Sequence, residues 1–318
     1  MLAGHLARSL ASPLARQLVA QQSGRPFDWD ILRDGMTPRR GSVAFTRAST
    51  ATFVDPSTSY LATAAINVAR IESDGLLIEA SNTNYCLQSE NLANASWSKF
   101  RLNTAAVTSP TNGLNALRLT PTAVNNTHVA LQKITQNITA DFCITLYAKP
   151  QGYNWLFVIS DNTASSAAVG GYFDISSNAL GSPYAVQGIL ISREITAAPN
   201  GYKRIKICFR HNAGHQTGGG VQIFLASGNG GSIFTGDATN GIAIYGVEIK
   251  PSSPDSYIPT TAAAATRSAD VCTLAIPSTV ASLGITYGDN TTATVSVTSG
   301  GTYQLPASQK KYKSIIAL

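Results

Sequence analysis

Ile242-Ala-Ile-Tyr-Gly-Val-Glu-Ile-Lys250 decides the fold class, because apolar positions alternate along it as they do in a half-buried β-strand. An extended run, Ser256-Tyr-Ile-Pro-Thr-Thr261, and an Ala-rich connector then lead to Thr266-Arg-Ser-Ala-Asp-Val271. Near the start of the chain, Phe45-Thr-Arg-Ala-Ser-Thr-Ala-Thr52 echoes this last stretch. We expect a β domain to end at this seam and a further segment to begin.

The same alternation recurs from about residue 100 to residue 255, with Asn-Gly turn pairs between the runs. The predicted strands are Ala116 to Thr120, His128 to Ile134, Asp141 to Lys149, Trp155 to Ser160, Gly171 to Ile175, Ile189 to Arg193, Tyr202 to Arg210, Val221 to Ala226 and Ile242 to Lys250. No convincing helix interrupts them, which disfavours a parallel sheet with crossover helices. The sequence therefore predicts a mainly β protein built on an antiparallel jelly-roll β-sandwich.

Pattern changes along the chain predict four parts. Residues 1–24 are expected to form an anchor or oligomerisation helix, and residues 25–95 an extended region with short strands. Residues 96–272 are expected to form the jelly roll. Residues 273–318 are expected to form a small C-terminal β domain, because a Gly-Asp-Asn turn there precedes a further alternating run.

Leucines at every fourth position mark the first part, at Leu2, Leu6, Leu10, Leu14 and Leu18. On a helix this spacing makes a slowly drifting apolar stripe. Arg8 and Arg16 interrupt every apolar run, so neither a secretory signal nor a membrane span is expected. Two interpretations stay open: a helix folded onto its own domain, or a helix that docks on other proteins or on further copies of this chain.

Composition narrows the functional classes. Hydrophobic residues make up 44% of the chain and charged residues only 13%, which excludes disorder and suits a sandwich with neutral polar strand faces. The net charge is +6, yet the basic residues are scattered rather than gathered into a nucleic-acid footprint. We expect at most a mild attraction to anionic surfaces such as bacterial polysaccharide, and no cofactor.

Cysteine and histidine spacing gives no metal motif. The cysteines lie far apart, at Cys86, Cys143, Cys208 and Cys272. This spacing disfavours a zinc ribbon or a dense disulfide framework. We expect Cys143 and Cys208, which lie in predicted strands, to be small buried apolar side chains. His211 and His215 lie close to Cys208, but the Glu of a His-Glu-x-x-His helix is missing. This segment is expected to be a loop that follows a strand.

Catalytic patterns are weak as well. A polysaccharide-cleaving enzyme needs two carboxylates about 5 to 10 Å apart. Only 17 residues are acidic, and the strand-associated Glu79, Glu194 and Glu248 have no suggestive partner in sequence. A Gly-x-Ser-x-Gly elbow is also absent. We expect no enzymatic activity, with a polysaccharide depolymerase as the least favoured alternative.

Aromatic and amide residues indicate a binding function instead. The predicted site consists of Tyr153, Asn154, Trp155, Asp161 and Asn162. Sugars offer an apolar C–H face and a rim of hydroxyls, which suits flat rings beside amides and carboxylates. Further candidates are Trp97, Tyr172, Tyr184 and Tyr202. The alternative is that these rings simply fill the core of the sandwich.

A set of ordered motifs runs from about residue 42 to residue 272. Besides the two echoing stretches, it includes Gly75-Leu-Leu-Ile-Glu79, Asn82-Thr-Asn84, Ala95-Ser-Trp-Ser-Lys99 and Tyr257-Ile-Pro-Thr260. Together they resemble the head-spike or fibre proteins of tailed bacteriophages, which carry a carbohydrate-binding-like jelly roll. Asn82-Thr-Asn84 departs from the Ala-Arg-Thr-Asn run that is common in that family.

This resemblance implies a structural protein on the exterior of a phage particle, assembled in the host cytoplasm. It implies attachment to capsid or tail proteins through the N-terminal helix, an oligomer with trimeric symmetry preferred, and adhesion of the sandwich to host-surface polysaccharide. The resemblance supplies no catalytic residues. A connector that anchors another fibre to the particle without binding glycan is the alternative.

Overall fold

Two compact units make up the chain, and one of them is assembled from separate stretches. The computed structural model describes residues 24–136, 140–162, 166–212, 219–251 and 256–318. Unit 1 contains the residues up to Ala48 together with Ile66–Ala80 and Ala269–Leu318, and unit 2 contains Ser49–Ala65 and Ser81–Ser268. The predicted leucine-striped helix lies outside the described residues. The predicted limits at residues 24, 95 and 272 differ from this division, because strands distant in sequence pair within unit 1.

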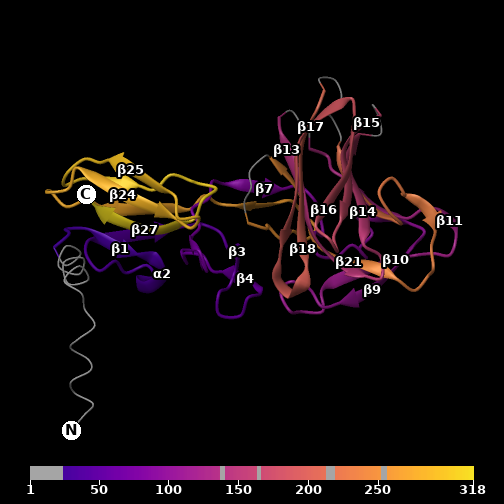
Figure 1. The fold of residues 1–318 in the computed structure, drawn as a ribbon, viewed down its shortest axis with the longest axis horizontal. Coiled ribbons are helices and arrows are strands. Elements are labelled where there is room, and N and C mark those ends of the chain that lie inside the picture. Colours follow the sequence, from indigo (N-terminus) through magenta and orange to yellow (C-terminus); the bar gives the residue numbers. More distant parts are fainter. Residues whose placement is uncertain (1–23, 137–139, 163–165, 213–218, 252–255) are drawn as a thin grey trace, which may run out of the picture. The chain divides into compact units, whose positions relative to one another are not determined.

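The described residues of unit 1 form a small all-antiparallel β structure with one short helix. Its elements are β1 (Asp28–Asp30), α2 (Ile31–Asp34), β2 (Ser42–Thr46), β5 (Ile71–Glu72), β6 (Gly75–Leu76), β23 (Val271–Ala275), β24 (Ser282–Tyr287), β25 (Thr292–Ser296), β26 (Thr302–Gln304) and β27 (Tyr312–Ala317). One sheet has the order β25-β24-β27-β6-β5, with β1 paired to β27, and the other has the order β2-β23-β26. Trp29, Leu274, Leu283 and Ile315 belong to its core. Figure 1 labels β1, α2, β24, β25 and β27 of this unit.

A buried ionic cluster ties the three stretches of unit 1 together. Arg47 follows β2, Asp270 precedes β23, and the two side chains pair at 3.1 Å. Arg70 reaches the other oxygen of Asp270 at 2.6 Å and pairs with Glu79 at 2.7 Å. The echoing stretches of the sequence are therefore the points where the chain leaves unit 1 and returns to it.

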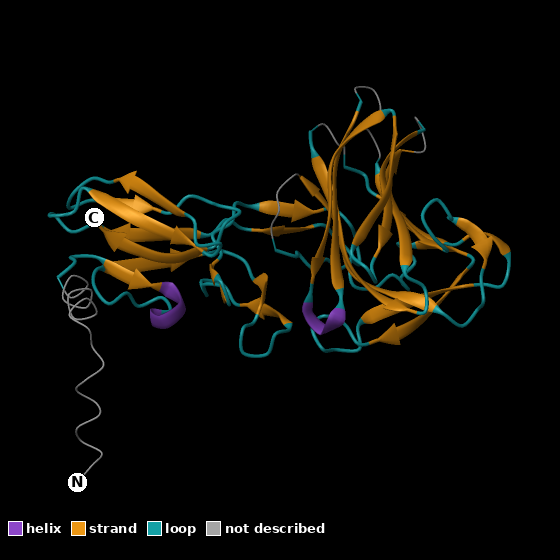
Figure 2. Cartoon of the chain, viewed as in Figure 1, coloured by secondary structure: helices purple, strands orange, loops and turns teal. Residues whose placement is uncertain are grey.

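Unit 2 contains the remaining strands, and strands dominate it (Figure 2). They are β3 (Ala51–Val54), β4 (Leu61–Ala64), β7 (Asn82–Asn84), β8 (Ser98–Phe100), β9 (Leu102–Val107), β10 (Ala116–Pro121), β11 (Asn125–Thr127), β12 (Val129–Lys133), β13 (Phe142–Gln151), β14 (Trp155–Asn162), β15 (Ala167–Asp174), β16 (Ala179–Val186), β17 (Gly188–Ala197), β18 (Lys203–His211), β19 (Gly220–Ala226), β20 (Ile233–Thr235), β21 (Gly241–Pro251) and β22 (Ala265–Arg267), with a 3-10 turn η2 (Pro199–Gly201).

Two six-stranded antiparallel sheets face each other across the core of unit 2. Sheet I has the order β17-β18-β13-β21-β10-β9, and sheet II has the order β16-β15-β14-β19-β12-β8. Successive strands cross between the sheets, since β10 and β13 lie in sheet I while β12 and β14 lie in sheet II, as in a jelly roll. Ile144, Ile207 and Ile244 from sheet I meet Val158 and Ile223 from sheet II in one core. The predicted antiparallel sandwich is confirmed.

A bulge explains why the alternation in β21 changes phase. Ile242 and Ile244 point into the core, and after Gly246 the core positions become Val247 and Ile249. The pairing of β21 with β13 shifts register at this point, and Gly246 has a φ of 61°, which glycine adopts without steric cost. The shift leaves Glu248 on the outer face of sheet I.

Cysteine pairing is the first correction to the sequence analysis. Cys143 and Cys208 lie directly opposite each other on β13 and β18 and form a disulfide. They are therefore not a pair of free buried thiols. The sequence pattern of each strand by itself does not reveal that β13 and β18 are neighbours in the sheet, so the pairing could not be predicted. Cys86 and Cys272 are free and buried. No helix in the described ranges is long and apolar enough to cross a membrane.

Candidate functional site

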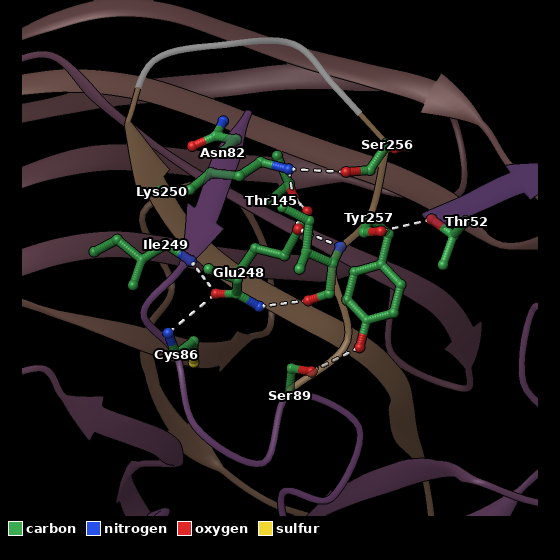
Figure 3. Close-up of polar contacts among 12 residues, drawn as sticks. Thr52, Asn82, Cys86, Ser89, Thr145, Glu248, Ile249, Lys250, Ser256 and Tyr257 are labelled. Carbon is green, nitrogen blue, oxygen red and sulfur yellow. Dashed lines mark hydrogen bonds and ion pairs between the residues drawn. The ribbon is translucent and has the colours of Figure 1, made fainter. Parts of the chain in front are cut away.

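The outer face of sheet I carries a cluster of tyrosines, whereas the outer face of sheet II carries a row of aromatic rings. On sheet I, the outer face is covered by segments of the same unit. Tyr147, Tyr245 and Tyr257 pack there with Leu61, and the rings of Tyr147 and Tyr257 meet edge to face at 6.0 Å. Thr52 donates a hydrogen bond of 2.6 Å to the backbone carbonyl of Tyr257 (Figure 3). The part of this face around these tyrosines is therefore occupied within unit 2.

A buried carboxylate under this cover is structural rather than catalytic. Glu248 accepts hydrogen bonds from the Lys250 ammonium at 2.9 Å and from the Ile258 amide at 2.8 Å, and Thr145 donates to its other oxygen (Figure 3). Both charged side chains are fully buried. A buried pair of this kind is retained when its hydrogen-bonding capacity is used within the protein. Glu248 thus fixes the segment after β21 and is not available to a substrate.

Sheet II carries a second, aromatic side-chain layer on its outer face. Along β14, Leu156 and Val158 point into the core, whereas Phe157 and Ile159 point outward, because successive side chains of a strand alternate. The outward residues of β14, β15, β16 and β19 form what we call the aromatic face: Trp155, Phe157, Ile159, Ala168, Tyr172, Tyr184, Phe224 and Ala226.

Phe157 is at the centre of the aromatic face. Its ring stacks on Tyr172 with centroids 4.3 Å apart, and it contacts Phe224 at 5.3 Å and Tyr184 edge to face at 5.5 Å. The register places Phe157 directly opposite both Tyr172 and Phe224, so three adjacent strands present a continuous row of rings. The central rings are nearly buried by their neighbours, while Tyr184 is 41% exposed and Trp155 and Phe224 are half-buried.

A glycine makes room for Trp155 at one end of this row. A β-carbon on Gly181 would lie 2.7 Å from the Trp155 ring, which is closer than any contact that a real side chain makes. Asn229 adjoins this end, where its carbonyl oxygen accepts a bond of 2.7 Å from the Ser182 amide. Its own amide donates to the Ser182 hydroxyl at 3.1 Å. A flat indole is therefore bordered by an exposed amide and a hydroxyl.

Charged and amide groups border the opposite end. One oxygen of Asp161, Oδ2, accepts hydrogen bonds from the Lys133 ammonium at 2.6 Å and from the Gln222 amide at 2.5 Å. The second oxygen, Oδ1, is buried and has no hydrogen-bond partner among the described residues. A buried acceptor left in this state costs about 1–3 kcal/mol unless water or a ligand supplies a donor. The aromatic face is thus apolar in its centre and polar at both ends.

The predicted site residues separate into two groups. Trp155 and Asp161 both belong to the aromatic face or its border, six positions apart on β14. Tyr153 is half-buried and packs against Phe234 with ring centroids 5.3 Å apart, and burial, with the charge of Asp237, raises its pKa. Asn154 is exposed just before β14, and Asn162 ends that strand.

The four further aromatic candidates lie in different parts of unit 2. Of the further candidates, Tyr172 and Tyr184 lie on the aromatic face. Trp97 is in the main core instead, and Tyr202 is buried under sheet I, where burial raises its pKa to about 12. The sequence analysis missed Phe157 and Phe224. The spacing of Trp155, Phe157, Ile159 and Asp161 at every second position was the available signal, since these positions share one face of a strand.

The histidine pair does not form a metal site in the described residues. Cys208 is bonded to Cys143, and His215 lies outside the described residues. His211 is buried and lies 3.2 Å from the hydroxyl of Ser160. Within the described ranges, no three His, Cys, Asp or Glu side chains are grouped closely enough to hold a metal ion.

Comparison with known proteins gives only distant structural likeness. No protein-family model matches the chain, and no curated protein matches it in sequence. The enzymatically active domain of tailspike protein 4 from bacteriophage CBA120 is 14% identical with a TM-score of 0.33, over 52% of this chain and 21% of that domain. This chain thus spans about a fifth of the tailspike domain.

Two carbohydrate-binding domains show a similar level of likeness. A module that specifically recognises mannan is 11% identical with a TM-score of 0.31, over 54% of this chain and 96% of the module. The xylan-binding domain from Paenibacillus barcinonensis is 12% identical with a TM-score of 0.32, over 54% of this chain and 98% of that domain. Values this low assign neither a family nor a ligand, so the function proposed below rests on the geometry of this chain.

Proposed function

We propose that unit 2 is a glycan-binding module and that its ligand lies on the aromatic face. The observation that carries this proposal is the row formed by Phe224, Phe157 and Tyr172 on the outer face of sheet II. At the border of this row, Trp155 and Tyr184 stay partly exposed. Pyranose rings present apolar C–H faces that pack on aromatic rings, while their hydroxyls need amide and carboxylate partners. Gln222 and Asn229 supply such partners at the two ends.

The carboxylates of this face favour binding over cleavage. Asp174 lies opposite Trp155 across β14 and β15, and Asp161 lies six positions further along β14. At a rise of about 3.3 Å per residue, the two carboxylates are about 20 Å apart. A glycosidase pair needs about 5 to 10 Å. We therefore propose a non-catalytic module rather than a depolymerase.

We further propose that the chain is a structural protein on the exterior of a bacteriophage particle. The ordered motifs between residues 42 and 272, which resemble those of phage head-spike and fibre proteins, support this proposal. In this proposal the leucine-striped residues 1–24 attach the chain to other virion proteins. Several copies, with a trimer preferred, make weak single sites effective, because linked sites raise the effective ligand concentration.

Replacing Trp155 with alanine is expected to weaken glycan binding at least tenfold, which corresponds to about 1.4 kcal/mol. The change removes a half-buried ring from the end of the aromatic face and leaves the main core intact. Binding is measured by biolayer interferometry against a panel of immobilised bacterial polysaccharides, with dissociation constants determined for each one that binds.

Tyr60→Ala is the matched control, because Tyr60 is also a partly exposed aromatic residue of unit 2 but lies between β3 and β4. It should bind as the unaltered protein does. Equal affinity of Trp155→Ala and Tyr60→Ala, or no binding to any polysaccharide by the unaltered protein, would contradict the proposal and favour the non-binding connector.

A further inference from the structure

Unit 2 also contains a pocket whose lining includes no residue of the aromatic face. It has a volume of about 410 Å³ and is bordered by the loop after β7, the start of β10 and the segment that follows Ile258. The lining residues used in the argument below are Gln88, Glu90, Asn91, Leu114, Asn115 and Thr261; Leu117 and Thr260 complete the lining. We call it the Glu90 pocket. Its lining is more apolar than polar, and its polar groups are neutral amides and hydroxyls beside one formal charge.

Among the described residues, the groups that hydrogen-bond to the Glu90 carboxylate are all neutral. The Tyr245 hydroxyl donates to Oε1 at 2.6 Å and the Tyr257 hydroxyl at 3.3 Å, and the Asn115 amide donates to Oε2 at 3.3 Å. Burial, and after it the negative charge of Glu90, raise the pKa of both tyrosines, so their hydroxyls stay protonated donors. No cationic side chain of the described residues pairs with Glu90.

This arrangement leaves the carboxylate with unused capacity. An ionised carboxylate offers about four acceptor sites, and the protein uses three of those of Glu90. A partly enclosed negative charge without a counter-ion favours a cationic ligand, because opposite charges attract more strongly where water is partly excluded. The remaining acceptor capacity faces a pocket that opens to solvent.

We propose that the Glu90 pocket binds an amino-sugar residue that carries a free ammonium group. The ammonium pairs with Glu90, the ring hydroxyls bond to Gln88, Asn91 and Asn115, and the apolar ring face lies against Leu114. The pocket exceeds the volume of one hexose ring. A linear lysine side chain would satisfy Glu90 but leave the surrounding amides without partners, so a saccharide fits better. The inference shares with the proposed function only the class of ligand.

The test compares glucosamine with glucose, which differ at one ring substituent, by titration followed in ¹H–¹⁵N NMR spectra. The amides of Asn91, Asn115 and Thr261 report on the pocket, and those of Gln222 and Asn229 report on the aromatic face. Protonated glucosamine should shift the pocket amides with a dissociation constant at least tenfold lower than glucose, because hydrogen bonds to charged groups are stronger than neutral ones. Glu90→Gln should abolish this preference.

Two further variants make the result decisive. Glu194→Gln, at an exposed carboxylate on β17, should leave the preference unchanged. Leu114→Lys should abolish glucosamine binding without affecting stability, because this side chain is 75% exposed and a lysine there supplies a competing ammonium. Trp155→Ala should leave the pocket shifts unaltered, which separates this result from that of the aromatic face.

Equal affinity for glucose and glucosamine, or a preference that persists in Glu90→Gln, would overturn the inference. Binding of n-butylamine as tight as that of glucosamine would overturn its saccharide part and indicate a lysine side chain of a protein partner.

Discussion

Asp270→Ala is expected to destabilise unit 1 by about 3–5 kcal/mol, the range found when one partner of a buried ion pair is removed. The Asp270 carboxylate contacts Arg47 at 3.1 Å and Arg70 at 2.6 Å. It also accepts a hydrogen bond of 2.9 Å from the backbone amide of Glu79. Both guanidinium groups and the carboxylate are fully buried. Alanine would leave two buried cations with Glu79 as the remaining acidic partner in the cluster.

Hydrogen exchange measured by mass spectrometry resolves the effect unit by unit. Peptides from β27 report on unit 1 and peptides from β13 report on unit 2. Asp289→Ala is the matched control, because Asp289 pairs with Lys310 at 2.9 Å on the surface of the same unit, with both side chains about half exposed. A surface pair contributes about 0–1 kcal/mol. Equal exchange of β27 in the two variants would show that the buried cluster does not hold unit 1 together.

Loss of the disulfide between Cys143 and Cys208 is expected to cost unit 2 about 4 kcal/mol. The bond closes a loop with a sequence separation of 65, and in the chain-entropy model a loop of this size constrains the unfolded state by that amount. Urea unfolding of unit 2 in the Cys143→Ala, Cys208→Ala double variant measures the loss. The unaltered protein under reducing conditions should show the same loss.

Thiol counting provides the control for this prediction. Unfolded protein without reductant should show two reactive thiols, from Cys86 and Cys272, and four after reduction. In the native state both free thiols should be unreactive, because they are buried, and burial raises the pKa of Cys272 to about 12. Four thiols without reductant would contradict the disulfide.

Local patterns predicted the strands well, because alternation of side chains is a property of each strand alone. The predicted strand at Tyr202 to Arg210 corresponds to β18, and the one at Val221 to Ala226 corresponds to β19. β16 and β9 were missed, since most side chains of both strands are exposed and therefore show little apolar alternation. Edge strands whose side chains are mostly exposed carry a weak sequence signal.

Long-range relations could not be predicted in the same way. The pairing of Arg47 with Asp270 joins residues 223 positions apart, and the chain between them contains all of unit 2 together with the Ile66–Ala80 stretch of unit 1. The sequence showed the two stretches as an echo but not as contacts, so the C-terminal strands were expected to form a separate domain. For the candidate site, Trp155 and Asp161 were predicted from their chemistry, and the structure places both on or beside the aromatic face. Phe224 was missed because only the order of strands in sheet II brings it beside Phe157.

Fluorescence quenching tests whether a glycan lies on the aromatic face. Trp29 and Trp97 are buried, at 0% and 1% exposure, whereas Trp155 is half-buried, so acrylamide should quench mainly Trp155. The experiment uses a polysaccharide that the binding panel has identified, at a saturating concentration. This glycan should lower the acrylamide quenching constant of the unaltered protein to the value measured for the Trp155→Phe variant. Saturating glycan that leaves the quenching constant unchanged would contradict binding at this face.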